Sequence, residues 1–175
     1  MPRFNRSSWP LFLAVLALAL TFAATALAQS TSQKLFFIQR SKNANEVHYD
    51  ARVTVSGTLQ AKDPVDAYWL RKASDGSRDS IGTFQKIAYG FDVDPGPEAG
   101  THTMRLTALK ERALTLLQVN GKWRARTQIN GKPAYLKRLY IATDESGVFP
   151  KVLYVDIFGE EVGSGAAIQE HLVKK

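Results

Sequence analysis

Alternation of apolar and polar residues is the clearest pattern along this chain. Between residues 47 and 55 every second side chain is apolar, and His48, Asp50, Arg52 and Thr54 occupy the positions between them. Strict alternation places the two sets on opposite faces of a β-strand. This segment is therefore predicted to be a half-buried antiparallel strand.

Shorter apolar segments predict further strands. Pro64 precedes an aromatic segment at 65–71, and proline suits the first position of a strand because it donates no hydrogen bond to the ladder. Segments of the same kind recur through the rest of the chain. The predicted strands cover residues 34–39, 47–55, 65–71, 102–109, 113–119, 122–129, 134–142, 151–158 and about 166–173.

The region between the third and fourth of these strands has a different pattern. Ile81, Phe84 and Ala88 lie at helical spacing and predict a short helix within residues 78–89. Residues 92–100 contain two prolines and two glycines, which predicts an irregular loop.

Two Asn-Gly pairs, at residues 120–121 and 130–131, predict tight turns ten residues apart. Both residues of such a pair tolerate positive φ, so each is expected to form a two-residue type I′ hairpin, and together they give a three-stranded meander. With these turns, one face of the meander is predicted to be core: Leu114, Leu116, Trp123, Ala125 and Leu136. The other face carries Leu117, Lys122, Arg124, Arg126 and Lys137.

That register sets Arg124 directly opposite Lys137, and like charges across a strand pair are destabilising by up to about 1 kcal/mol. A bulge that shifts the pairing, separation by solvent, and binding of an anion are three explanations that stay open. The candidate binding residues are therefore Lys122, Arg124, Arg126 and Lys137.

Positive charge is concentrated in this same part of the chain. Residues 105–138 hold nine lysines and arginines with Glu111 as their only acid, in a chain of net charge +7. Such a field attracts anions over about 8 Å in physiological salt. The partner is unknown from the sequence; the candidates are anionic envelope components or small ligands, namely lipid headgroups, acidic glycans and phosphorylated small molecules, and nucleic acid is not expected. A solvated face that only keeps the protein soluble is the alternative.

Asp156 interrupts an apolar face. The strand at 151–158 is apolar on both sides and is predicted to be central, with Asp156 between Tyr154 and Phe158. A buried carboxylate must be paired or hydrogen-bonded. Asp156 is therefore expected either to contact an arginine or to line an interior pocket.

These elements predict a mainly all-β fold, an antiparallel meander of about eight or nine strands with one short helix. A barrel-like domain or a sandwich would each solve the problem of exposed strand edges. Residues 29–175 have the length of a single domain. The chain has no cysteine, so it forms no disulfides.

The first 28 residues predict export. Arg3 and Arg6 give a basic start, residues 11–20 are continuously apolar, and residues 26–28 read Ala-Leu-Ala. This is the pattern of a secretory signal peptide cleaved after Ala28. The remaining chain is then expected to be periplasmic or secreted, without a transmembrane anchor.

Catalytic motifs are scarce. There is no phosphate-binding loop, no Gly-x-Ser-x-Gly elbow and no His-Glu-x-x-His, and neither a cofactor nor a metal is predicted. His48 and Asp50 are candidates because residues two apart on a strand point the same way, as a base and its orienting partner would. Asp156 is a third candidate, and Arg40 or His102 could complete the set. A surface pair on a solvated face is the alternative for His48 and Asp50.

Several short motifs together resemble a known group of proteins. They lie at residues 35–43, 47–50, 64–65, 68–69 and 88–90. In combination they are similar to a family of exported bacterial domains catalogued only as a domain of unknown function. The resemblance implies that residues 34–173 form one unit. It implies no activity, substrate or catalytic residue.

The favoured function is therefore an exported, non-catalytic binding or envelope-associated domain, since the sequence supplies recognition features without a reaction centre. A periplasmic hydrolase that uses His48 and Asp50 is one alternative. A structural component of an envelope assembly is another.

Overall fold

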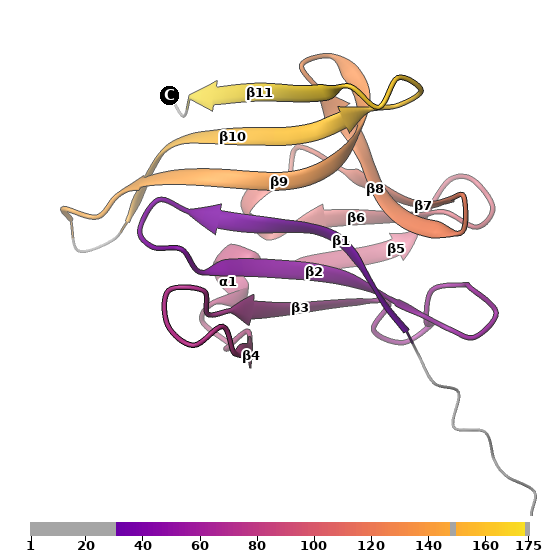
Figure 1. The fold of residues 1–175 in the computed structure, drawn as a ribbon, viewed down its shortest axis with the longest axis horizontal. Helices are drawn as coiled ribbons and strands as arrows, with labels where there is room; N and C mark the ends of the chain where they lie inside the picture. Colours follow the sequence, from indigo (N-terminus) through magenta and orange to yellow (C-terminus); the bar gives the residue numbers. More distant parts are fainter. Residues whose placement is uncertain (1–30, 148–149, 174–175) are drawn as a thin grey trace, which may run out of the picture.

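A computed structural model describes residues 31–147 and 150–173 of the chain (Figure 1). The predicted signal peptide lies outside the described residues. Eleven strands and two short helical segments make up the described part. They are β1 (Thr31–Arg40), β2 (Glu46–Val53), β3 (Val65–Leu70), β4 (Arg78–Ser80), α1 (Lys86–Tyr89), β5 (Phe91–Pro95), β6 (His102–Leu106), the 3₁₀ turn η1 (Thr107–Leu109), β7 (Leu114–Val119), β8 (Lys122–Ile129), β9 (Lys132–Asp144), β10 (Lys151–Glu161) and β11 (Ala167–Val173).

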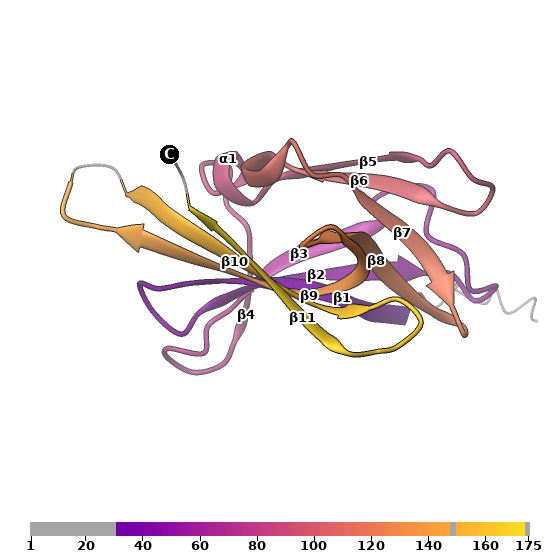
Figure 2. The same ribbon diagram turned by 90° about the horizontal axis from the view of Figure 1, so that it is seen from above.

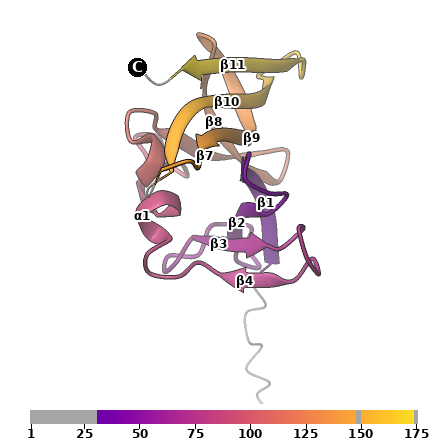
Figure 3. The same cartoon turned by 90° about the vertical axis from the view of Figure 1, so that its left-hand side faces the viewer.

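All eleven strands belong to one curled sheet. Its path runs β4-β3-β2-β1-β9-β8-β7-β6-β5, and β10 and β11 branch from β9. Figure 2 shows β5 and β6 in a layer across from β1, β2 and β3. Figure 3 shows the curled sheet from its side, with α1 across from β1. The prediction of a mainly β fold with one short helix is confirmed, and its shape is a half-barrel with a projecting two-stranded branch.

One strand pair is parallel. β1 pairs with β9 in the same direction, from Phe37 opposite Arg138 to Arg40 opposite Ile141, whereas the other described pairs are antiparallel. The sequence pattern predicted only antiparallel neighbours. Alternation reports which side chains share a face and carries no information about the direction of the adjacent strand, so this pair could not be read from it.

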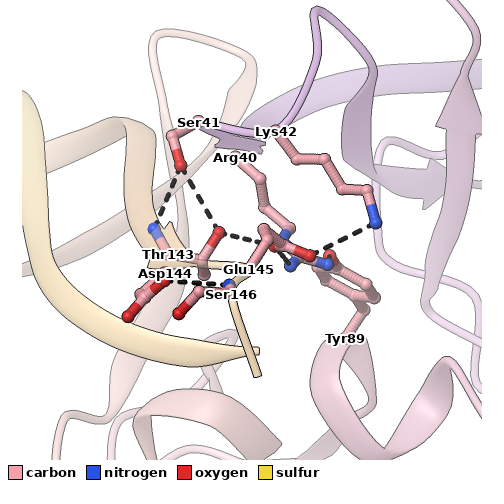
Figure 4. A network of polar contacts seen from close by, with 8 residues as sticks. All are labelled: Arg40, Ser41, Lys42, Tyr89, Thr143, Asp144, Glu145 and Ser146. Atoms are coloured by element: carbon pink, nitrogen blue, oxygen red, sulfur yellow. Dashed lines mark hydrogen bonds and ion pairs between the residues drawn. The ribbon is translucent and has the colours of Figure 1, made fainter. Parts of the chain in front are cut away.

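Polar contacts hold the turn that follows β1 to the end of β9 (Figure 4). The Ser41 N–H donates to the carbonyl of Ile141 at 3.0 Å, and the Ser41 Oγ accepts the N–H of Thr143 at 3.0 Å. Glu145 accepts a hydrogen bond from Arg40 at 2.5 Å. These contacts continue the parallel pair beyond its last ladder residue.

The two Asn-Gly hairpins are confirmed. Asn120 and Asn130 both have φ of 49°, Gly121 and Gly131 have φ of 76° and 75°, and each turn joins strands through a two-residue loop. The predicted core face is confirmed as well, because its five members are all buried: Leu114, Leu116, Trp123, Ala125 and Leu136.

The region between β3 and β6 differs from the prediction. The helix covers only Lys86–Tyr89, and residues 78–80 form β4 against β3. Residues 91–95 form β5, which pairs with β6, so the predicted loop begins only after Pro95. Pairing with a neighbouring strand outweighs local composition here, and Pro95 is tolerated because β5 is an edge strand.

Tyr49 joins the two layers of the half-barrel. Its ring, which is fully buried, stacks on Phe36 at 4.7 Å and meets the edge of Phe91 at 5.8 Å. Its hydroxyl donates to the carbonyl of Tyr89 at 2.8 Å. Trp69 contacts the Tyr89 ring from β3 at 5.1 Å. Side chains from β2 and β3 thus hold the start of β5 in place across the interior.

Replacing Tyr49 by phenylalanine is expected to lower the free energy of unfolding by about 1–3 kcal/mol, because the buried Tyr89 carbonyl loses its hydrogen-bond donor. Urea denaturation would measure the loss. Tyr154→Phe is the matched control, since the Tyr154 hydroxyl has no hydrogen-bond partner among the described residues, and it should change stability by less than about 0.5 kcal/mol. Equal effects of the two substitutions would contradict the assigned role.

Candidate functional site

Ionisable and aromatic side chains gather on the face of β3, β2, β1, β9 and β10 that points away from the core. This face is here called the outer face. It is turned toward the viewer in Figure 1, and no described helix or strand lies in front of it. Cross-strand pairing places five of its side chains in one row, here called the aromatic row: Tyr68, His48, Phe37, Arg138 and Phe158.

The aromatic row is stacked along most of its length. The ring centroids of Tyr68 and His48 are 5.5 Å apart, and those of His48 and Phe37 are 5.3 Å apart. The Arg138 guanidinium lies 4.1 Å from the centroid of Phe158, within the range of a cation–π contact. The row therefore consists of a stacked triplet on β3, β2 and β1 and a cation–π pair on β9 and β10.

The aromatic row buries polar groups on β2. Glu46, His48 and Asp50 are only 5%, 4% and 7% exposed, so the interpretation of His48 and Asp50 as a pair on a solvated face is wrong. Neighbouring side chains cover them, because Phe37 and Tyr68 stack on either side of His48. Alternation predicts that these residues share a face, but cover by neighbouring side chains depends on the tertiary structure.

Glu46 is the centre of a charged network. Its Oε1 accepts a hydrogen bond from Lys72 Nζ at 2.7 Å, and its Oε2 lies 2.7 Å from His48 Nε2. Burial raises the pKa of Glu46, but the bonds from Lys72 and His48 outweigh it, so that pKa is lowered overall. An ionised carboxylate only accepts hydrogen bonds, so His48 Nε2 is the donor.

Burial also lowers the pKa of His48, and this effect exceeds the opposing effect of the bond to Glu46. His48 is thus held neutral, with Nε2 committed to a carboxylate. Neither Arg40 nor His102 completes a catalytic set with it. Arg40 is bonded to Glu145, and the ring centroid of His102 lies 5.9 Å from that of Trp123.

Asp50 is bonded separately. Its Oδ2 accepts hydrogen bonds from Ser32 at 2.9 Å and from the Tyr68 hydroxyl at 3.0 Å. Burial and the nearby Asp50 charge raise the pKa of Tyr68 to about 12. Asp50 Oδ1 is buried without a hydrogen-bond partner among the described residues. Asp50 and His48 therefore belong to two adjacent sets of bonds on one strand.

A cleft opens beside this network, where β8 and β9 separate, and is here called the cationic cleft. It has a volume of about 590 Å³ and is lined by four basic side chains. Three of them, Lys122, Arg124 and Lys137, were predicted as binding residues, and Lys34 of β1 is the fourth. Lys34 Nζ also lies 5.1 Å from the ring centroid of Phe37, which connects the cleft to the aromatic row.

Glu160 of β10 resolves the predicted clash between Arg124 and Lys137. One carboxylate oxygen, Oε2, lies 3.1 Å from Arg124 Nη1 and 3.0 Å from Lys137 Nζ. The bond from Lys137 lowers the pKa of Glu160 despite some burial, and the bond from Arg124 adds to the effect. An anion does hold the two cations together, and it is a carboxylate of the chain itself.

Arg126 does not reach the cationic cleft. It lies further along β8 and lines a separate hollow with Glu111 and Arg112. Arg112 is bonded to Glu170 of β11 through both guanidinium nitrogens, at 2.6 and 2.8 Å. The predicted set of four basic residues is therefore divided between two places, three at the cleft and one outside it.

Asp156 is placed differently from either expectation. Its Oδ1 lies 2.6 Å from His171 Nδ1 of β11, so its partner is a histidine and not an arginine. It lies on the outer face, opposite Tyr140, while Ile157 next to it is fully buried in the core. Three strand spacings separate it from the His48 strand, a distance of about 14 Å, so the three candidate catalytic residues do not meet.

Comparison with known proteins gives one match. Residues 36–171 match a family described as a domain of unknown function (DUF4833). The chain belongs to this family. No curated protein and no solved structure matches it. The matched residues run from β1 to β11 and so include strands of both the half-barrel and its branch. No helix of the described residues is long and apolar enough to cross a membrane.

Several residues of the site escaped the sequence analysis, among them Lys34, Glu46 and Glu160. Lys34 lies opposite Asp50 in the β1–β2 pair, Glu46 continues the polar positions of β2 by one more step, and Glu160 comes from a strand near the end of the chain. The position of Glu46, two residues before His48, was a usable signal. Lys34 and Glu160 had none, because only strand pairing brings them to the cleft.

The neutral state of His48 predicts a pH dependence of stability. The folded-state pKa lies below the ordinary value of 6.5, so the unfolded chain takes up this proton first as the pH falls. The contribution of neutral His48 to the free energy of unfolding is fully present above about pH 7, and it declines as the pH drops toward the folded-state pKa. A glutamine side chain does not titrate, so His48→Gln should show a shallower loss of melting temperature between about pH 7 and pH 5.

Thermal unfolding of both proteins across this range would measure the difference, with circular dichroism at pH 8 to confirm that the variant folds. A variant that keeps the full slope of the original protein would contradict the assignment.

Proposed function

We propose that this domain is a non-catalytic binding module for a phosphate- or sulfate-bearing ligand, held in the cationic cleft, and that it acts outside the cytoplasm after export. The carrying observation is the gathering of four cations, Lys34, Lys122, Arg124 and Lys137, around one cleft of about 590 Å³. That volume lies within the usual range for ligand pockets, about 300–1,000 Å³. Export is supported by the leader pattern of residues 1–28.

Unsatisfied charge supports an anionic ligand. Glu160 partners Arg124 and Lys137, whereas Lys34 and Lys122 have no carboxylate within 4 Å among the described residues. Several cations with one carboxylate between them leave a local positive potential, which attracts anions. The binding of a phosphate or sulfate group is stronger when two of its oxygens each accept a hydrogen bond. Tyr135 adds a flat side wall, with Arg124 4.9 Å from its ring centroid.

The geometry supports a hydrolase less well. His48 is only 4% exposed between the rings of Phe37 and Tyr68, so the Nδ1 lone pair that stays free while Nε2 donates to Glu46 is covered from a substrate. Asp50 is engaged with Ser32 and Tyr68 and does not orient the imidazole. A role as a structural component of an envelope assembly stays a prediction without a specific contact to support it.

The double substitution Lys34→Gln with Lys122→Gln is expected to weaken anion binding about tenfold, because two exposed charge contacts are each worth roughly 0.5–1 kcal/mol. Isothermal titration with inorganic phosphate and with a heparin tetrasaccharide would measure it, and a third titration with anionic lipid vesicles would separate a headgroup from a soluble ligand. The matched control is Lys62→Gln with Lys110→Gln, which removes the same charge outside the cleft. Equal losses in both double variants would mean that only net charge matters.

Glu160→Gln should strengthen phosphate binding by roughly fivefold, since the substitution removes the carboxylate that competes for Arg124 and Lys137. Glu98→Gln is a suitable control because this side chain lies in the exposed loop after β5. The gain should shrink as salt is raised, as expected for a screened contact. Unchanged or weaker binding by Glu160→Gln would show that the ligand does not use these two cations.

A further inference from the structure

A second hollow lies where the two ends of the curled sheet face each other. It has a volume of about 480 Å³ and is lined on one side by Val65 and Ala67 of β3 and on the other by Phe91 and Val93 of β5. β3 lies next to the short end strand β4, and β5 is the last strand at the opposite end of the path. β4 pairs only with residues 68–70, so the first half of β3 is an open edge.

Hydrogen-bond alternation fixes which main-chain groups face this hollow. The Arg52 N–H donates to the carbonyl of Pro64, so even-numbered residues of β3 bond to β2. The N–H groups of Val65 and Ala67 therefore point away from β2. No described residue accepts a hydrogen bond from either of them.

The same alternation applies to β5. The Thr107 N–H donates to the carbonyl of Gly90, and the Gly96 N–H donates to the carbonyl of Thr101, so even-numbered residues bond to β6. Phe91 and Val93 then direct their N–H and C=O groups away from β6. Among the described residues these groups have no main-chain partner.

The hollow thus presents main-chain donors on two edges above an apolar floor of Val65, Ala67, Phe91 and Val93, and the charged residues Asp63, Lys86 and Asp92 also belong to its lining. The side chains of Ala67, Phe91 and Val93 pack on the core, and Val65 is 4% exposed. Contacts of Tyr49 and Trp69 with Tyr89 hold the two edges in position from inside. An edge strand with unpaired groups is a template for another strand, and here both strands that line the hollow carry such groups.

We propose that this slot binds an extended polypeptide segment of a partner protein by strand addition between β3 and β5, completing the barrel wall. Main-chain bonds to both edges would supply affinity, and alternate side chains of the segment would rest on the apolar floor. This is independent of the cationic cleft, which lies at the junction of β1, β8 and β9. β4 and β11 also have free edges among the described strands, and each offers pairing on one side only.

The test uses ¹⁵N-labelled protein and a capped peptide of about seven residues that alternates valine and threonine, with a terminal lysine for solubility. The expected result is that the amide signals of Val65, Ala67, Phe91 and Val93 shift and that their hydrogen exchange slows by at least about tenfold. The same peptide with alternate backbone nitrogens methylated is the control, because it keeps the side chains and loses the donors.

Val93→Pro removes one outward N–H from β5 and should weaken binding at least about tenfold, and proline is tolerated at an edge position. Gln169→Pro is the matched variant. Glu161 N–H donates to the Ala166 carbonyl, so Gln169 also directs its N–H outward, on β11, and its loss should leave binding unchanged.

Three results would overturn the proposal: no shift at about 1 mM peptide, equal shifts with the methylated peptide, or shifts confined to β11. Protection of the same four amides by self-association, without peptide, would also overturn it. If Val93→Pro fails to fold, the methylated peptide decides alone.

Discussion

A strand has only two edges, but β9 pairs with three strands, β1, β8 and β10. One edge is taken by β10 along nearly its whole length. The other edge is shared in sequence, first by β8 up to Tyr135 and then by β1 from Arg138 onward. Because β8 and β1 cannot occupy the same edge at one point, they diverge where one replaces the other. The cationic cleft is the space that this divergence leaves.

The branch formed by β10 and β11 supplies the negative charge at the cationic cleft. β9 brings Lys137, β8 brings Arg124, and β10 on the far edge of β9 brings the carboxylate of Glu160 to both. A bulge between Phe158 and Gly159 shifts the register of β10 just before this residue. Gly159 is required there, since a Cβ atom would meet the side chain of Ile129 and the carbonyl of Tyr135. The position of one charge thus depends on a local irregularity in the ladder.

The outer face shows how a row of stacked side chains can bury charge without a second layer of secondary structure. Phe37 and Tyr68 stack on either side of His48, and Glu46 is satisfied by Lys72 at its second oxygen. Such a network rigidifies the surface next to the cleft when all its members are bonded. On the inner side, the Tyr49 hydroxyl holds the opposite layer through its bond to the Tyr89 carbonyl. The edges of β3 and β5 that line the second hollow stay unpaired. Both candidate binding places therefore border on positions where the curled sheet fails to pair continuously.

Local chemistry in the sequence determined the strands of the meander, both Asn-Gly turns and the buried face that includes Trp123, because alternation and positive φ are properties of a few neighbouring residues. It also placed Arg124 and Lys137 near each other, and left open whether a bulge, solvent or an anion separates their charges. The tertiary structure alone decided that this counter-charge is Glu160, that His48 and Asp50 are buried, and that β5 is a strand. Each of these depends on which distant segment lies alongside, and strand pairing is set by contacts across the whole domain that no short pattern records.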